Sequence, residues 1–243
     1  MNSNCTQFTR IGKRLESLCR KALYEYKLVE SKKIAIALSG GKDSITLAYL
    51  LSKISGKGFP LLDLHAIHVS GEFSCGPAIT ENYLKEICDT LHIPLTIVES
   101  KQKRETLACY SCSRERRRLL FHKAKDLEFQ TIAFGHHLDD SIQTLLMNLL
   151  HKGEFAANLT KIYMHDYDIT IIRPLIYVFE KDILSFAKTN GFARIMCQCP
   201  IGQKSKRNDT KILIENMEKL FPNARNNLAI ASREYGSKKA LTK

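Results

Sequence analysis

The residues best suited to chemistry form a short polar loop, Ser39-Gly40-Gly41-Lys42-Asp43-Ser44. An apolar stretch at 33–38 precedes it and a helix-like stretch follows it, which is the pattern of a buried strand, a glycine turn and a helix start. Such a turn presents backbone N–H groups and the positive end of a helix dipole to a phosphate. Lys42 adds a positive charge and Ser44 a hydroxyl, whereas Asp43 suits a phosphate site through a bound metal. The loop is therefore predicted to bind a nucleotide, and the other interpretation is an ordinary glycine turn.

A second polar loop, Gly135-His136-His137-Leu138-Asp139-Asp140, follows another apolar stretch at 130–134. Because the carboxyl ends of parallel strands meet at one edge of a sheet, the two loops are predicted to converge. Gly135 would let the backbone lie close to the nucleotide, and His136 would contact a phosphate. The other interpretation of His136 is a surface residue at a helix start.

The carboxylates of the two loops form a candidate magnesium site. Asp43 together with Asp139 or Asp140 could hold Mg²⁺ against a triphosphate, because Mg²⁺ prefers oxygen ligands. Either aspartate of the second loop could instead cap the helix that follows, a position to which Asp is well suited. The sequence does not say which of the two would meet the metal.

Two cysteine pairs, Cys109/Cys112 and Cys197/Cys199, form a second group of reactive residues. The chain has eight cysteines and no export signal, so disulfides are not expected. A Cys-x-x-Cys pair places two thiolates within reach of one metal or cluster, and flanking arginines favour the thiolate. A four-thiolate zinc site, an iron–sulfur cluster with three protein ligands and a thioredoxin-like redox pair all remain open. The tight Cys-x-Cys spacing favours three ligands.

Positive charge is concentrated in a few segments of a chain whose formal net charge is +12. Basic clusters beside a nucleotide loop indicate a polyanionic partner such as a nucleic acid, although a generally basic surface is the other interpretation. A basic helix at 113–127 and a loop at 204–207 are predicted to contact phosphates. The candidate residues are Arg114, Arg116, Arg117, Arg118, Lys204, Lys206 and Arg207.

The elements that must position these residues have the pattern of an α/β fold. Short apolar strands are predicted at 33–38, 61–69, 94–98, 130–134 and 169–172, with helices at 42–54, 78–91, 113–127 and 180–190 between or after them. Near-continuous apolar strands that alternate with helices indicate a parallel sheet covered on both faces. Further predictions are a helix at 8–28, a mobile loop at 152–168, helices at 211–220 and 224–235, and a disordered tail at 236–243.

Length and composition are those of one folded domain with small additions. The 243 residues are 44% apolar, and no apolar run approaches the roughly 20 residues that span a bilayer. We therefore expect a cytoplasmic protein with no membrane segment, and a monomer and a homodimer both remain open. The predicted division is an N-terminal helical segment at 1–31, a nucleotide-binding domain at 32–192 and a C-terminal cysteine loop with helices at 193–243.

Several motifs occur together in one order and resemble the tRNA-cytidine 2-sulfurtransferase family of PP-loop ATP pyrophosphatases. The resemblance extends from about residue 33 to 220, and the motifs are SGGKDS at 39–44, CYSCSR at 109–114, GHHLDD at 135–140, IRPL at 172–175 and Cys197. It implies an adenine nucleotide alpha hydrolase-like PP-loop domain that binds ATP through 39–44 and Gly135. It also implies that Cys109, Cys112 and Cys197 hold a [4Fe-4S] cluster with one iron free. The chain departs from the family at Cys197-Gln198-Cys199, where the family has Cys-x-x-Cys, so the role of Cys199 is open.

The resemblance implies a sulfur-inserting reaction on tRNA. ATP with Mg²⁺ would adenylate C2 of an anticodon-loop cytidine, and sulfur from a separate donor would then give 2-thiocytidine. Lys42, Asp43 and the three cysteines Cys109, Cys112 and Cys197 are the implied catalytic residues. The alternatives are another PP-loop ligase similar to lysidine synthase and a zinc-stabilised RNA-binding protein without catalysis.

Overall fold

A central six-stranded sheet organises the protein, with the strand order β3-β2-β1-β4-β6-β5. The computed structural model describes residues 9–71, 77–101, 109–192 and 206–235. All neighbouring strands of this sheet are parallel except β5, which pairs antiparallel with β6. The strands are β1 (Lys33–Ala37), β2 (Asp63–Ser70), β3 (Leu95–Glu99), β4 (Thr131–Ala133), β5 (Lys161–Met164) and β6 (Ile169–Ile172).

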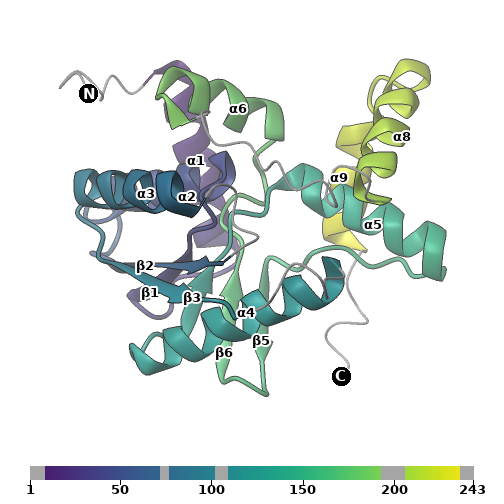
Figure 1. The fold of residues 1–243 in the computed structure, drawn as a ribbon. Coiled ribbons are helices and arrows are strands. Elements are labelled where there is room, and N and C mark those ends of the chain that lie inside the picture. Colours follow the sequence, from purple (N-terminus) through teal and green to yellow (C-terminus); the bar gives the residue numbers. More distant parts are fainter. Residues whose placement is uncertain (1–8, 72–76, 102–108, 193–205, 236–243) are drawn as a thin grey trace.

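Helices cover both faces of the sheet, as the alternating pattern predicts. Figure 1 shows α1, α2, α3 and α6 on one face and α4 on the other, while α5, α8 and α9 gather beside the sheet. The predicted α/β class with helices on both faces is therefore confirmed. The described helices are α1 (Arg10–Glu25), α2 (Lys42–Ile54), α3 (Pro77–Leu91), α4 (Cys109–Asp126), α5 (Leu138–Lys152), α6 (Glu180–Thr189), α8 (Lys206–Leu220) and α9 (Ala224–Glu234).

The alternating side chains of β1 divide the core into two layers. Ile34 and Ile36 pack with residues of α1, α2 and α6, such as the fully buried Leu15 and Phe186. The intervening Ala35 packs in a second cluster against α4. Because neighbouring residues of a strand point to opposite faces, a strand buried on both sides must be apolar on both, as β1 is after its exposed first residue Lys33.

A third, smaller cluster joins α5 to the two C-terminal helices. Leu138 and Ile142 of α5 pack with Ile214 of α8 and Ala229 of α9. This packing places the C-terminal helices beside the segment that follows β4. No helix in the described part of the chain is long and apolar enough to cross a membrane.

The structure differs from the predicted elements at three places. The stretch 152–168, predicted to be a mobile loop, contains β5, whose four residues pair with β6. The helix predicted at 211–220 begins earlier, at Lys206, and the helix predicted at 113–127 begins at Cys109. The prediction of a disordered tail at 236–243 falls outside the described residues.

Candidate active site

The loop between β1 and α2 is folded by its own serines and glycines. Gly40 has a φ of 87°, a left-handed conformation that favours glycine. The Ser44 hydroxyl donates to the Gly41 carbonyl at 3.0 Å and accepts from the Ser39 amide at 3.2 Å. The loop therefore keeps its curvature through these internal bonds.

The first turn of α2 has free backbone donors. Its N-cap residue is Gly41, and no side chain makes a capping hydrogen bond there. The first N–H groups of a helix have no partner within the helix, and together with the helix dipole they attract anions. The loop at 39–44, called the phosphate loop below, thus has a helix end that its glycine leaves open, a geometry that suits a phosphate.

Gly135 brings the second polar loop into direct contact with the first. A Cβ atom at this position would lie 2.9 Å from the Asp43 carbonyl carbon and 2.9 Å from the Ser44 nitrogen. No side chain can occupy that space, so a glycine is needed where the two loops touch. The predicted convergence of the two loops at one edge of the sheet is thereby explained by backbone contact.

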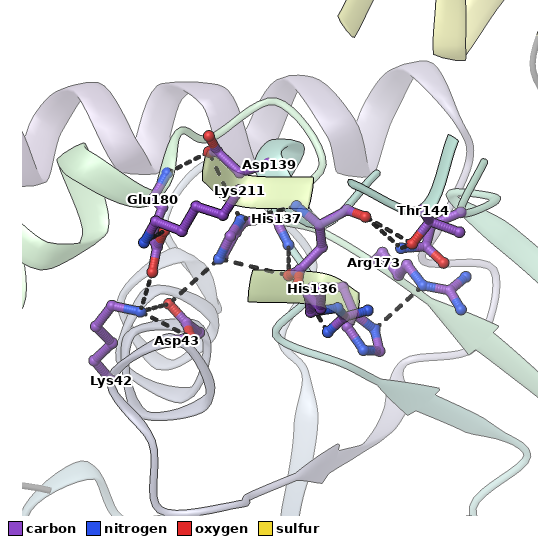
Figure 2. Close-up of polar contacts among 12 residues, drawn as sticks. Lys42, Asp43, His136, His137, Asp139, Thr144, Arg173, Glu180 and Lys211 are labelled. Atoms are coloured by element: carbon purple, nitrogen blue, oxygen red, sulfur yellow. Dashed lines mark hydrogen bonds and ion pairs between the residues drawn. The ribbon is translucent and has the colours of Figure 1, made fainter. Parts of the chain in front are cut away.

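His137 begins α5 and lies between two carboxylates. Its Nδ1 accepts the Asp140 amide at 3.4 Å, while its own amide donates to the Asp140 carboxylate at 3.0 Å, which makes a capping box. Because Nδ1 accepts, the proton of a neutral His137 lies on Nε2. Nε2 is 3.5 Å from Asp140 and 3.8 Å from Asp43, so this buried imidazole links the two loops (Figure 2).

The adjacent aspartates of α5 have different environments. Asp139 is 3% exposed; its carboxylate accepts the Glu180 amide at 2.7 Å and pairs with Arg225 of α9. Asp140 instead faces a cavity and lies 3.4 Å from Arg207 of α8. Burial raises the pKa of Asp140, but His137, His136 and Arg207 outweigh it and leave this pKa below its ordinary value.

Lys42 takes part in a chain of ion pairs that ends on α8. Its ammonium group lies 3.0 Å from Asp43 and 3.1 Å from Glu180, and the other Glu180 oxygen lies 3.2 Å from Lys211 (Figure 2). Burial raises the pKa of Glu180, but the two lysines outweigh it and bring this pKa to about 2. Burial likewise lowers the pKa of Lys42, and Asp43 and Glu180 outweigh it, so this pKa lies above its ordinary value. Both groups are charged at neutral pH.

These residues surround a cavity of about 250 Å³. Three carboxylates line it together with one imidazole and two cations of α8: Asp43, Asp140, Glu180, His137, Arg207 and Lys211. Alternating positive and negative groups in one cleft suit a ligand that carries both phosphates and a divalent cation, because each component meets groups of the opposite sign.

Comparison with known proteins identifies the family. The PP-loop domain family matches residues 9–209. The tRNA-cytidine(32) 2-sulfurtransferase of Syntrophotalea carbinolica is 33% identical over 90% of this chain and 88% of its own length. The enzyme of the same name from Citrifermentans bemidjiense is 33% identical over 92% of this chain and 89% of its own length. The chain belongs to the tRNA-cytidine 2-sulfurtransferase family.

A solved structure from a related group of enzymes has the same fold as this member of the tRNA-cytidine 2-sulfurtransferase family. It is the U34-tRNA thiolase NcsA from Methanococcus maripaludis with its [4Fe-4S] cluster, and its TM-score is 0.75 at 25% identity. The match covers 90% of this chain and 77% of that one. The family resemblance drawn from the motifs and the PP-loop fold are both confirmed.

The cysteines that the 2-sulfurtransferase resemblance points to lie partly within the described residues. Cys109 and Cys112 are in the first turn of α4, three residues apart, a spacing that puts both on one side of a helix. Cys197 lies outside the described residues, as does Cys199. The Arg116 guanidinium donates to the Val69 carbonyl at 3.1 Å, which places the second turn of α4 at the carboxyl end of β2. Cys109 precedes Arg116 by seven residues, about 10 Å along the axis of α4.

The predicted nucleic-acid residues have different surroundings. Arg114, Arg117 and Arg118 are exposed on α4, whereas the half-buried Arg116 holds Val69. Arg117 donates to Ser113 at 3.1 Å. Lys206 is exposed at the start of α8, and Lys204 lies outside the described residues. Arg207, predicted to contact nucleic acid, lines the cavity instead of a separate surface, although half of its side chain is exposed.

Several residues of this site were missed by the sequence analysis. Glu180 and Lys211 belong to no recognised motif, and Arg225 lies further along the chain. His137 could not be distinguished from His136, because both belong to the same motif and only the capping geometry separates them. Glu180 could have been found from the sequence, because it is an acidic residue at the start of the predicted helix at 180–190. This helix start lies at the carboxyl edge of the sheet.

Proposed function

We propose that this chain is an ATP-dependent tRNA thiolase that replaces the C2 oxygen of a cytidine in the anticodon loop with sulfur. The observation that carries the proposal is that Asp43, at the open end of α2, meets Asp140 around one cavity, while Lys42 pairs with Asp43 and Glu180 of its lining. Family membership supports the substrate, because the curated relatives are named tRNA-cytidine(32) 2-sulfurtransferases. The cysteine-bearing turn of α4 starts at the same edge of the sheet.

The first step activates the base. The C2 oxygen of the cytidine attacks the α-phosphorus of ATP, a new P–O bond forms, and the bond to the leaving pyrophosphate breaks. Negative charge accumulates on pyrophosphate, and the N–H groups at the start of α2 together with Lys42 are placed to stabilise it. This step converts the C2 oxygen, a poor leaving group, into part of AMP, a good one.

The carboxylates suit a bound magnesium ion. Asp43 and Asp140 both lie within 3.8 Å of the same His137 nitrogen and both line the cavity, so two hard oxygen ligands face one space. Asp139 is directed at Arg225 and the Glu180 amide. We therefore assign the metal to Asp43 and Asp140. Bound Mg²⁺ would neutralise phosphate charge.

The second step delivers sulfur. A sulfur nucleophile attacks C2 of the adenylated base, a C–S bond forms, the C–O bond breaks and AMP leaves. The first turn of α4 fits a thiolate-ligated cluster, because the helix dipole lowers the pKa of thiols at a helix start. Cys109, Cys112 and Cys197 would hold a [4Fe-4S] cluster, which when bound would supply an iron for the incoming sulfide. A cysteine desulfurase or free sulfide would provide this sulfur.

The tRNA would lie across the basic face of α4. Exposed arginines there suit phosphate contacts, and the target base must leave its stack to reach the cavity. In this arrangement residues 32–192 activate the base, 193–243 complete the site and 1–31 support the sheet. For a reaction on tRNA anticodon loops we expect the protein to act in the cytoplasm.

The test is a thiolation assay with protein purified without oxygen. Unmodified tRNA, ATP, Mg²⁺ and sulfide are incubated with the protein, and 2-thiocytidine is measured by nucleoside mass spectrometry together with AMP and pyrophosphate. The wild type is expected to form all three products. The variant Cys109→Ala is expected to lose iron and thiolation but to keep ATP binding, because the phosphate site does not include α4.

The matched control is Cys88→Ala, which removes a buried thiol of α3 that no part of the proposed site uses. It is expected to keep iron and activity. Thiolation by Cys109→Ala would contradict the role of the cluster. A colourless zinc protein that does not thiolate tRNA would favour an RNA-binding protein, and transfer of an amine would favour a lysidine synthase-like ligase.

A further inference from the structure

Arg173 is a fixed cation directly after β6. Its amide donates to the Thr160 carbonyl at 2.9 Å, and its Nη1 donates to the Leu159 carbonyl. In the described part of the chain no carboxylate pairs with this guanidinium. Burial and Arg117 lower the pKa of Arg173 to about 10, so the group is still protonated at neutral pH. Its N–H groups are therefore permanent donors with a set direction.

A second donor of this guanidinium is directed at His136. Arg173 Nε donates to His136 Nδ1 at 3.3 Å (Figure 2). An arginine can only donate, so Nδ1 must keep its lone pair and the proton of the neutral imidazole must lie on Nε2. Protonation of Nδ1 would set two donors against each other. The hydrogen bond thus selects one tautomer and opposes the charged form.

The surroundings of His136 act in the same direction. The ring stacks on Phe134, with centroids 5.6 Å apart and planes 11° apart, which holds its orientation. Burial, together with the charges of Arg173, Arg207 and His137, outweighs the opposing charge of Asp140 and lowers the pKa of His136 to about 4. Nε2 has no hydrogen-bond partner among the described residues, and the preceding residue, Gly135, touches the phosphate loop.

We propose that Arg173 is a positioning residue that holds His136 as a neutral hydrogen-bond donor, through Nε2–H, to a phosphate oxygen of the bound substrate. A neutral donor can bind an anionic oxygen without taking a proton from it. It also excludes His136 as the general base of the reaction, since its only basic nitrogen is covered by Arg173. The ligand is a phosphate oxygen of ATP or of the tRNA backbone, and this assignment rests on the proposed function.

The test reads the tautomer directly. Long-range ¹H–¹⁵N NMR of histidine-labelled protein identifies which ring nitrogen is protonated, and loss of one signal set in His136→Gln assigns the resonances. In the wild type we expect the Nε2–H form at neutral pH, with a titration midpoint near 4. In Arg173→Met both tautomers should be populated and the midpoint should rise towards the ordinary 6.5. Arg173→Lys should restore part of the wild-type behaviour.

Arg116→Met is the matched control, because Arg116 also holds a backbone carbonyl but does not contact His136. It is expected to leave the His136 signals unchanged. A wild-type His136 protonated on Nδ1, or a tautomer unaffected by Arg173→Met, would overturn the proposal even if thiolation proceeds. If the wild type shows the Nε2–H form but does not thiolate tRNA, the proposed function fails and the positioning role stands.

Kinetic constants identify the phosphate. Loss of a hydrogen bond to a charged oxygen costs roughly tenfold or more in affinity. If the oxygen belongs to ATP, Arg173→Met should raise the KM for ATP by about that factor and leave the KM for tRNA unchanged. The reverse pattern would assign the oxygen to tRNA. If neither KM changes although the tautomer does, His136 does not donate to a phosphate and that part of the proposal is wrong.

Discussion

Gly135 shows how a single residue type can join two motifs that are far apart in the sequence. The motif analysis connected this glycine to a bound nucleotide, whereas the structure explains it by the backbone of the phosphate loop. A Cβ would lie 2.9 Å from Asp43 and Ser44 atoms, and those atoms are main chain, so they cannot turn away as a side chain would. The consequence is that the geometry of the phosphate loop depends on residue 135.

We predict that Gly135→Ala lowers both stability and ATP affinity. The added methyl group must displace main-chain atoms of the loop, and such overpacking typically costs about 1–3 kcal/mol. Thermal unfolding and ATP titration by calorimetry would measure the two effects in the same preparation.

The control is Gly58→Ala, at a position with a φ of 62° and no atom within 4 Å of the added Cβ. Its left-handed backbone would cost roughly 1 kcal/mol in stability, and ATP affinity should remain that of the wild type. Equal ATP affinity of Gly135→Ala and the wild type would show that the loop tolerates the methyl group and that the contact has no functional role.

At the scale of elements, α8 and α9 belong to the cavity as much as the strands do. Three ion pairs connect them to the edge of the sheet: Arg207 with Asp140, Lys211 with Glu180, and Arg225 with Asp139. Of these, the pair at Asp139 is the most buried, with 4% of that side chain exposed. The position of the C-terminal helices is therefore set by charge as well as by the small apolar cluster on α5.

We predict that Arg225→Met destabilises the protein by roughly 3 kcal/mol, because it leaves the Asp139 carboxylate buried, with the Glu180 amide as its hydrogen-bond donor within the described part of the chain. Urea unfolding at neutral pH would measure the loss. Glu218→Gln removes the outer partner of the same arginine, at a side chain that is 33% exposed, and should cost about 1 kcal/mol or less. Similar losses from both variants would show that burial of Asp139 does not govern this junction.

Much of this element pattern could be predicted from the sequence. The strands at 33–38 and 94–98 were recognised because they are apolar and bounded by turn residues, and the phosphate loop because strand, glycine and helix signals agree. β5 was missed because its four residues are mostly half-buried and pair antiparallel at the end of the sheet, so they lack the apolar pattern of the inner strands. The helix predicted to begin at residue 113 begins four residues earlier, at Cys109 of α4.

The site was less predictable than the fold. Local patterns revealed the residues that share a loop, such as Lys42 and Asp43. Glu180 and Lys211 are brought to the same cavity only by tertiary packing, and ion pairs of that range leave no periodic signal. The choice of Asp139 or Asp140 as the magnesium ligand likewise depends on which carboxylate pairs with α9. This pairing cannot be predicted from the motif.

At the scale of the whole molecule, part of the excess positive charge lies on one face of the sheet. The exposed arginines of α4 lie on the face of the sheet opposite α1, α2 and α6 (Figure 1). Charges on this face attract a polyanion, and phosphate contacts release counterions, so binding weakens as salt concentration rises. The proposed tRNA complex should have this property.

We predict that Arg117→Gln weakens tRNA binding and reduces the slope of log K against log salt by about one contact. Fluorescence anisotropy of labelled tRNA over a series of KCl concentrations would measure both. The control is Lys188→Gln, which removes one exposed charge from α6 on the other face. Equal slopes for both variants would indicate that net charge alone attracts the tRNA and that α4 is not the contact surface.

The chain of ion pairs in the cavity determines how a charged ligand can replace the protein's own ion-pair partners. Asp43, Asp140 and Glu180 are each already paired with a cation or a histidine of the protein itself. A ligand composed of a divalent metal and a polyphosphate can enter by exchanging partners, since the metal takes the carboxylates and the phosphates take the released lysines and arginine. Such an exchange brings no unpaired charge into a half-buried site. Without ligand, lysines and an arginine of the protein neutralise the carboxylates of the cavity. With ligand, the metal and the phosphates take over these partners, so the charge of the cavity is nearly balanced in both states.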